Sequence, residues 1–212
     1  MTPPVPREAQ RDRLLEAALV HIPFDGWSRR ALFAGARDLE IDPWLARRLF
    51  PRGGDDMLAH LDRWADRQML ARIDPAALGQ MRVRERIATL VRTRLEVLAP
   101  HREAMRRATA ARLLPANAFA ACTSLWRTVD AIWSTAGDRA QDASYYSKRS
   151  LLAAVWASTF LFWLEDRSPG FEDSFAFLDR RIEDVMQIGK LRARLDDALA
   201  GLRRLNPLGA AR

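Results

Sequence analysis

Residues 45–61 read LARRLFPRGGDDMLAHL and contain the clearest break between two helices. Apolar residues recur at three- and four-residue steps on both sides of this break, as they do in amphipathic helices. Pro51 and the Gly53–Gly54 pair interrupt the pattern. The sequence therefore predicts a short helix over 43–50 and a longer helix over 55–72.

Two helix-start signals precede this stretch. Ser28 can accept hydrogen bonds from the first-turn amides of a helix over 29–39. Asp42 followed by Pro43 combines a capping side chain with proline at the first helical position. The two short helices have the spacing of a helix-turn-helix, and the quoted stretch looks like the corresponding part of TetR-type regulators.

Binding of DNA is one interpretation of this motif, because Arg47, Arg48 and Arg52 can reach phosphates. However, residues 39–42 read LEID where those regulators usually have Gly-Val-Ser, so carboxylates lie where phosphates would approach. Residues 1–72 hold 12 basic and 11 acidic side chains, a net charge of only +1. We therefore predict a degenerate motif that binds no nucleic acid, with a TetR-like DNA-binding transcriptional regulator as the alternative function.

The remaining sequence keeps the helical period without sustained alternation. This predicts an all-α, TetR-like fold of about ten helices and no sheet. We expect three parts: helix-turn-helix-like helices (1–72), a lipid-binding helical domain (73–189), and an amphipathic helix with a tail (190–212). The further helices are expected over residues 7–22, 82–99, 101–113, 117–136, 142–166, 169–189 and 190–205.

Composition narrows the possible classes of protein. With 49% hydrophobic residues in 212, the chain can bury a large core. The single cysteine, Cys122, excludes an intrachain disulfide and fits a reducing compartment, and its position on an apolar stripe predicts a buried side chain. Residues 1–6 do not resemble a secretory signal. The uncharged run 151–164 is shorter than the roughly 20 residues of a membrane-spanning helix.

No pattern for catalysis is present in the sequence. His21, His60 and His101 are scattered, without a second histidine or a carboxylate at metal-ligand spacing. Glu-x-x-His, a glycine-rich phosphate loop and a nucleophile elbow are absent. We therefore predict no catalytic residue, no metal and no cofactor, and expect that the chain is not an enzyme.

Aromatic and aliphatic residues are concentrated on the helices expected over 117–136 and 142–166. Bulky rings often line apolar ligand cavities, although a stripe of this kind is also typical of an ordinary core. The candidate lipid-binding residues are Trp126, Val129, Trp133, Leu152, Val155, Trp156 and Phe160.

The last expected helix has a leucine face with basic margins, including Arg192, Arg194 and Arg203. This pattern suits an interfacial membrane helix, and equally a helix that packs on its own domain or on a second subunit. The candidate membrane-contacting residues are Leu191, Leu195, Leu199 and Leu202.

Residues 136–154, AGDRAQDASYYSKRSLLAA, and residues 180–189, RRIEDVMQIG, resemble a known family. With Asp166 and the segment 168–173, they are similar to the lipid-binding accessory proteins of ubiquinone biosynthesis, the coenzyme Q protein nine family. The similarity runs from about residue 12 to 190 and is carried by ordered, multi-residue motifs.

The resemblance implies a TetR-like homodimer that has lost DNA binding and holds an isoprenoid lipid or a phospholipid. It also implies a cytoplasmic protein, peripheral on the inner membrane, that presents a quinone intermediate to the demethoxyubiquinone hydroxylase. The family's partner surface corresponds to Tyr145, Tyr146 and Arg149. Tyr145 stands where the family usually has tryptophan, so an aromatic side chain is kept there.

Overall fold

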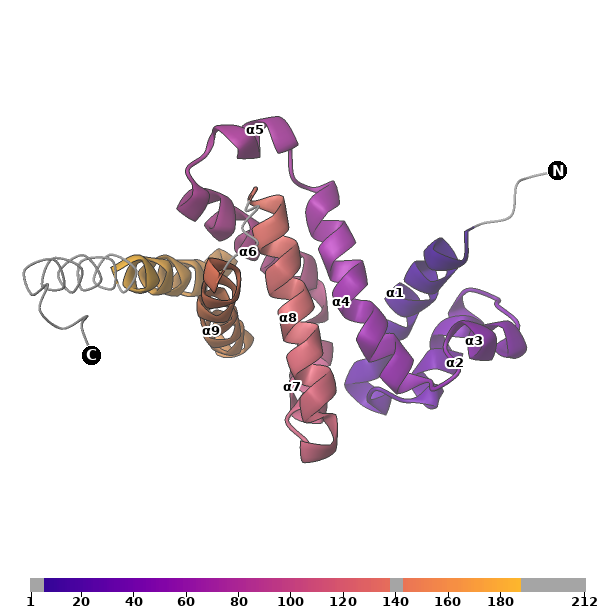
Figure 1. Ribbon diagram of the computed structural model, residues 1–212. Coiled ribbons are helices and arrows are strands. Elements are labelled where there is room, and N and C mark those ends of the chain that lie inside the picture. Colours follow the sequence, from indigo (N-terminus) through magenta and orange to yellow (C-terminus); the bar gives the residue numbers. More distant parts are fainter. Residues whose placement is uncertain (1–5, 138–142, 188–212) are drawn as a thin grey trace, which may run out of the picture.

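The computed structural model describes residues 6–137 and 143–187. These residues form helices, turns and short connections, with no strand among them, which confirms the predicted all-helical class. Figure 1 shows a small group of helices near the N-terminus, a central bundle, and α9 (Ala143–Glu165) at the far end of the bundle. The chain after α9 continues away from the centre as a further helix over residues 172–187.

The N-terminal group begins with α1 (Arg7–Asp25), α2 (Arg29–Asp38) and α3 (Pro43–Leu49). Both predicted caps are confirmed. The Ser28 hydroxyl accepts from the amides of Arg30 and Ala31, and the Asp42 carboxylate accepts from the amides of Trp44 and Leu45. These side chains satisfy first-turn N–H groups that lack partners within the helix.

Two glycines allow backbones to approach closely in this group. A Cβ on Gly35 of α2 would lie 2.5 Å from the amide nitrogen of Ala18 in α1. A Cβ on Gly54 would lie only 1.9 Å from the carbonyl oxygen of Trp27. Neither position can accept a side chain without displacement of backbone, so these glycines fix how α1, α2 and α4 pack.

The helix α4 joins this group to the central bundle, because it contacts α1 and α2 as well as α6 and α8. Leu61, Trp64 and Met69 of α4 are buried in one continuous core with residues of α1 and α6. The bundle consists of α4 (Gly54–Ala71), α6 (Val83–Leu98), α7 (Arg102–Arg112), α8 (Ala118–Thr135) and α9 (Ala143–Glu165).

The end of α1 differs from the sequence prediction, and one helix of the structure was not predicted. Pro23 lies inside the last turn of α1 and not beyond its end. Pro23 cannot donate a backbone hydrogen bond to the carbonyl of Leu19, and α1 ends two residues later. The short helix α5 (Pro75–Gln80) was not predicted, although Asp74 caps it in the way that Asp42 caps α3. The same Asp-Pro signal was therefore present at both sites.

The Asp166 carboxylate organises the connection after α9, where Arg102 also donates to the carbonyl oxygens of Leu164 and Asp166. Asp166 accepts from the amide of Ser168 (2.7 Å) and from the amide (2.9 Å) and hydroxyl (2.5 Å) of Ser174. Burial raises the pKa of Asp166, but these hydrogen bonds outweigh that effect and lower it to about 2. This turn fixes where helix 172–187 begins, and hence how its apolar face meets the bundle.

No helix among the described residues is both long and apolar enough to cross a bilayer. The uncharged run 151–164 instead lies in α9, where Trp163 is fully buried.

Candidate functional site: two cavities against α9

The larger cavity beside α9 has a volume of about 470 Å³. It lies between α6, α8, α9 and helix 172–187. Its walls are apolar except for Arg84 and Lys148. The residues that line it are Val83, Arg84, Ile87, Trp133, Lys148, Leu151, Leu152, Val155, Ile182, Val185 and Met186. We call this the apolar cavity.

Three of the predicted lipid-binding residues line the apolar cavity: Trp133, Leu152 and Val155. The Trp133 indole donates to the carbonyl oxygen of Lys148, which fixes the ring between α8 and α9. The sequence predicted a helix over 169–189 but not that it would form a wall of this cavity, because its position against α9 depends on the turn at Asp166.

A smaller cavity of about 210 Å³ lies where α4, α6, α7, α8 and α9 meet. Two predicted residues, Trp156 and Phe160, line it, and their rings stack with centroids 5.6 Å apart. Its floor is polar and includes Arg94, Asp62 and Thr128. We call this the polar-floored cavity. The predicted lipid-binding set is thus divided between two cavities.

Trp126 and Val129 were predicted to line a cavity, but neither lines either of these two. Val129 is fully buried in the core. Trp126 is half-buried and stacks on Tyr146, with ring centroids 6.2 Å apart. The sequence pattern placed these residues on one face of a helix. In the structure, different parts of that face contact the core, a cavity or solvent. Cys122, expected in the core, is exposed on the same helix.

The predicted partner surface is also altered by the structure. Tyr146 is 66% exposed, but Arg149 is buried, and its Nε donates to Asp130 at 2.7 Å. The buried Arg149 guanidinium thus pairs with a carboxylate, Asp130, whose side chain is 43% exposed. The side chain of Tyr145 lies outside the described part of the structure, as do the leucines predicted to contact a membrane, Leu191, Leu195, Leu199 and Leu202.

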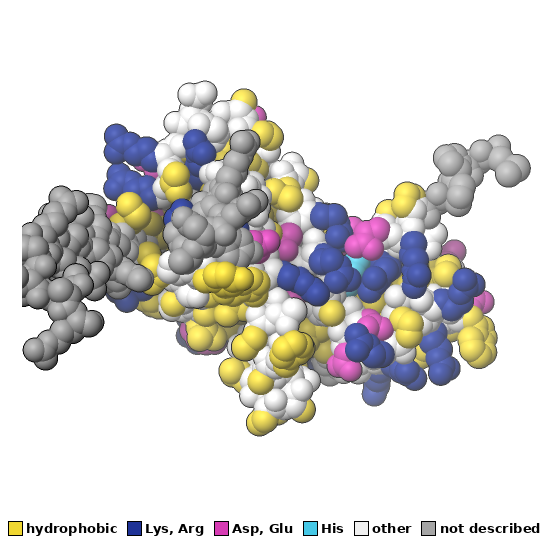
Figure 2. Space-filling view, viewed as in Figure 1, with side chains coloured by type: hydrophobic (Ala, Val, Ile, Leu, Met, Phe, Trp, Pro, Cys, Tyr) yellow, Lys and Arg dark blue, Asp and Glu magenta, His cyan; other side chains and the backbone are white. Residues whose placement is uncertain are grey.

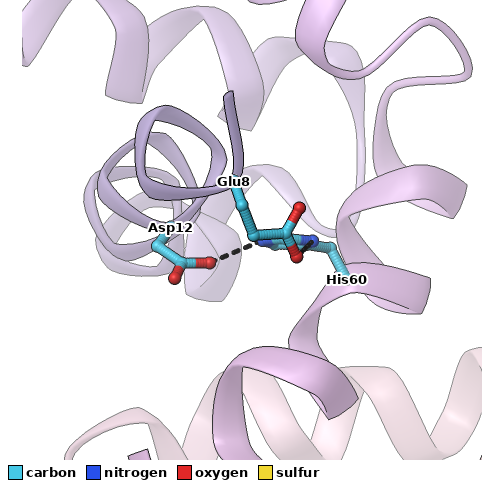
Figure 3. Close-up of side chains that lie close together, drawn as sticks. All are labelled: Glu8, Asp12 and His60. Atoms are coloured by element: carbon cyan, nitrogen blue, oxygen red, sulfur yellow. Dashed lines mark hydrogen bonds and ion pairs between the residues drawn. The ribbon is translucent and has the colours of Figure 1, made fainter. Parts of the chain in front are cut away.

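A cluster of two carboxylates and a histidine joins α1 to α4 (Figure 3). Glu8 and Asp12 lie one turn apart on α1, and both face the buried His60 of α4. The His60 Nε2 donates to Asp12 at 2.7 Å, while Arg67 pairs with both carboxylates. Burial lowers the pKa of His60, so the ring is neutral near neutral pH.

Sequence reasoning missed this cluster because His60 lies 48 residues from Asp12. The four-residue spacing of Glu8 and Asp12 was the only local signal, since it places both carboxylates on one helix face. Arg67 pairs with both carboxylates and Arg63 donates to the second ring nitrogen of His60, so two guanidinium groups balance the two negative charges that would attract a cation. The cluster therefore acts as an ion-paired connection between the two helices.

The second short helix, α3, presents an exposed basic surface. Figure 2 shows Lys and Arg side chains gathered over the end of the molecule that contains α1 to α3. Trp44, Arg47 and Arg48 are exposed on α3, but Arg52 is paired with Asp56 at 2.8 Å. One of the three arginines predicted to reach phosphates is thus already paired with a carboxylate.

Comparison with known proteins supports the family and the fold. Residues 118–189 match the COQ9 family model. The chain is 32% identical over 189 residues to the human "Ubiquinone biosynthesis protein COQ9, mitochondrial", covering 86% of this chain and 59% of the relative. A Drosophila melanogaster relative of the same name is 31% identical over 185 residues, covering 85% and 56%. A Schizosaccharomyces pombe relative is 27% identical, covering 84% and 71%.

The chain thus spans about three fifths of the length of the human relative, and these names state no enzymatic activity. A crystal structure of a TetR transcriptional regulator from Nitrosomonas europaea superimposes with a TM-score of 0.69 at 24% identity. The superposition covers 84% of this chain and 99% of the regulator, which confirms the predicted TetR-like fold. The family match and the aligned relatives together show that this chain is similar to the COQ9 family over most of its length.

Proposed function

We propose that this chain is a non-enzymatic accessory protein of ubiquinone biosynthesis that binds an isoprenoid lipid in the apolar cavity. The single observation that carries this proposal is the cavity itself. Its volume of about 470 Å³ lies within the range of small-molecule sites, and its walls consist almost entirely of hydrocarbon. A prenyl tail in this space would be removed from water, which is favourable in proportion to its buried apolar area.

Presentation of the lipid to a membrane enzyme is the second part of the proposal. The chain would lie peripherally on the inner membrane, with Leu191, Leu195, Leu199 and Leu202 in contact with the bilayer. We further propose that the protein is a homodimer. Replacement of Leu195, Leu199 and Leu202 by Ser should abolish flotation with anionic liposomes, and flotation of this variant at the wild-type level would contradict the membrane contact.

The demethoxyubiquinone hydroxylase is the proposed partner. The exposed Tyr146 ring, stacked on Trp126, offers an aromatic surface of the kind found at interface hot spots. Tyr146→Ala should weaken capture of the purified hydroxylase at least tenfold, whereas Phe24→Ala, which removes an exposed ring from α1, should leave it unchanged. Equal capture by both variants would contradict this assignment.

Lipid extraction from the purified protein, followed by mass spectrometry, tests the binding site. Val83 is half-exposed at the edge of the apolar cavity, so Val83→Phe fills the cavity with little risk to folding. We expect bound isoprenoid lipid in the wild type and a several-fold loss in Val83→Phe. Val20→Phe makes the same change at an exposed site on α1 and should retain the lipid. A wild type without lipid, or equal loss in both variants, would refute the proposal.

The alternative function, a DNA-binding regulator, is favoured by one observation: Arg47 and Arg48 are exposed on α3. A gel shift with DNA from upstream of the protein's own gene, abolished by Arg47→Ala with Arg48→Ala, would support it. Absence of a shift at low salt, where phosphate contacts are strongest, would exclude it.

A further inference from the structure

The polar-floored cavity contains a network of charged groups that are almost fully buried. Arg94 is 3% exposed, and it donates from Nε to Asp66 (2.9 Å) and from Nη2 to the Thr128 hydroxyl (3.1 Å). Thr128 is itself 2% exposed. Burial raises the pKa of Asp66, as expected for a carboxylate held away from water.

A second carboxylate completes the network. Asp62 is 6% exposed and accepts from Arg112 Nη2 (2.6 Å) and from the Ser124 hydroxyl (2.5 Å). Asp62 also lies 3.7 Å from Arg94 Nη2. Burying ion pairs of this kind is often no more stable than packing apolar side chains in the same volume. Stability alone therefore gives no reason to line a cavity with them.

Hydrogen-bonding capacity remains on the cavity side of this network. Among the described residues, Nη1 of Arg94 donates to no protein group, and the Thr128 hydroxyl accepts from Arg94 but donates to no group. Both are donors, so they match oxygen acceptors of a ligand. A ligand that covers these donors without such oxygens would leave them without an acceptor.

Two aromatic rings line the walls of this cavity. Trp156 and Phe160 stack with an interplanar angle of 29°, and the Arg94 guanidinium lies 4.8 Å from the Trp156 ring centroid. The cavity volume of about 210 Å³ is small. An engineered apolar cavity of about 150 Å³ binds benzene, so this space suits one substituted ring and not a long chain.

We propose that the polar-floored cavity binds an aromatic or quinone ring whose carbonyl or phenolic oxygens accept from Arg94 and Thr128. The inference rests on the proposed function and deepens it, because it assigns a ring site separate from the tail site. Val155 lines the apolar cavity and Trp156 lines the polar-floored one. Consecutive helical residues point about 100° apart, so α9 presents a different face to each cavity.

Calorimetric titration of the full chain with two probes tests this assignment. The ring probe is duroquinone, whose fully substituted ring cannot alkylate the exposed Cys122, and the tail probe is farnesol. Ala157→Leu fills the polar-floored cavity and should weaken duroquinone binding at least tenfold with less than a twofold effect on farnesol. Val83→Phe fills the apolar cavity, so it should weaken farnesol binding at least tenfold with less than a twofold effect on duroquinone.

Thr128→Val tests the hydrogen bond at nearly constant shape. We expect duroquinone to bind five- to tenfold more weakly, as for loss of one buried hydrogen bond, and Thr128→Ser to keep most of the affinity. Near-ultraviolet circular dichroism shows whether each variant is folded. If Thr128→Val does not fold, Ala157→Leu provides the test.

The outcomes separate the two proposals. The ring-site proposal is overturned if Ala157→Leu still binds duroquinone with wild-type affinity. It is also overturned if Val83→Phe loses duroquinone binding as much as Ala157→Leu does. Farnesol binding without duroquinone binding to the wild type overturns the ring site and leaves the proposed lipid-binding function intact. If the wild type binds neither probe, both proposals fail.

Discussion

Replacing Asp166 with Ala tests how the turn after α9 holds the wall of the apolar cavity. The carboxylate accepts three hydrogen bonds, from Ser168 and Ser174, and lies almost fully buried. The fall in its pKa from 3.8 to about 2 corresponds to roughly 2.5 kcal/mol of stabilisation. Loss of a helix cap costs about 0.5–2 kcal/mol. We therefore expect Asp166→Ala to lower the free energy of unfolding by about 2 kcal/mol at pH 7.

The pH dependence follows from the direction of the pKa. Because the folded-state pKa lies below the unfolded-state value, the contribution of Asp166 is fully present above about pH 4 and is lost as the pH falls toward 2. In urea titrations, the difference between wild type and Asp166→Ala should fall to about half its neutral value at pH 3. Glu165→Ala removes an exposed carboxylate one residue away and should change stability by less than about 0.5 kcal/mol.

The same variant connects stability to lipid binding. Helix 172–187 supplies Ile182, Val185 and Met186 to the apolar cavity, so a loosened turn at Asp166 should also weaken farnesol binding. A stability difference below about 0.5 kcal/mol, or one that stays constant between pH 7 and pH 3, would refute the reasoning.

Two further predictions concern the N-terminal group and the buried histidines. Gly54→Ala should cost about 2 kcal/mol or more in urea unfolding, because the new Cβ meets the Trp27 carbonyl oxygen at 1.9 Å. Gly79→Ala, with nothing within 4 Å, should be neutral or stabilising, and similar losses in both variants would contradict the clash. Burial lowers the pKa of both His60 and His101, so unfolding should become easier as the pH falls below about 6.5, where the unfolded chain binds protons more readily. His60→Gln should reduce this dependence in thermal unfolding, and an unchanged slope would show that His60 does not contribute.

Local signals in the sequence were sufficient for most helix boundaries. The caps at Ser28 and Asp42 act within three residues of themselves, so their effect needs no tertiary information. The period of apolar residues likewise identified an all-helical chain. Asp74–Pro75 carries the same helix-start signal for α5 as Asp42–Pro43 carries for α3, so α5 too was predictable from the sequence.

The sites depended on information that local patterns do not carry. An apolar stripe specifies one side of a helix, but each position on that side meets a different neighbour. Val129 is therefore core, Trp126 contacts a surface tyrosine, and Cys122 is exposed, although all three belong to one predicted stripe.

The sequence by itself determined the helical class, the positions of the caps and the resemblance to the COQ9 family, because each is encoded within a few turns of chain. Only the tertiary structure decided that the aromatic residues line two separate cavities and that Arg94 and Asp62 form the floor of one. These groups come from helices far apart in the chain, and their proximity results from packing of whole helices, which residue spacing does not determine.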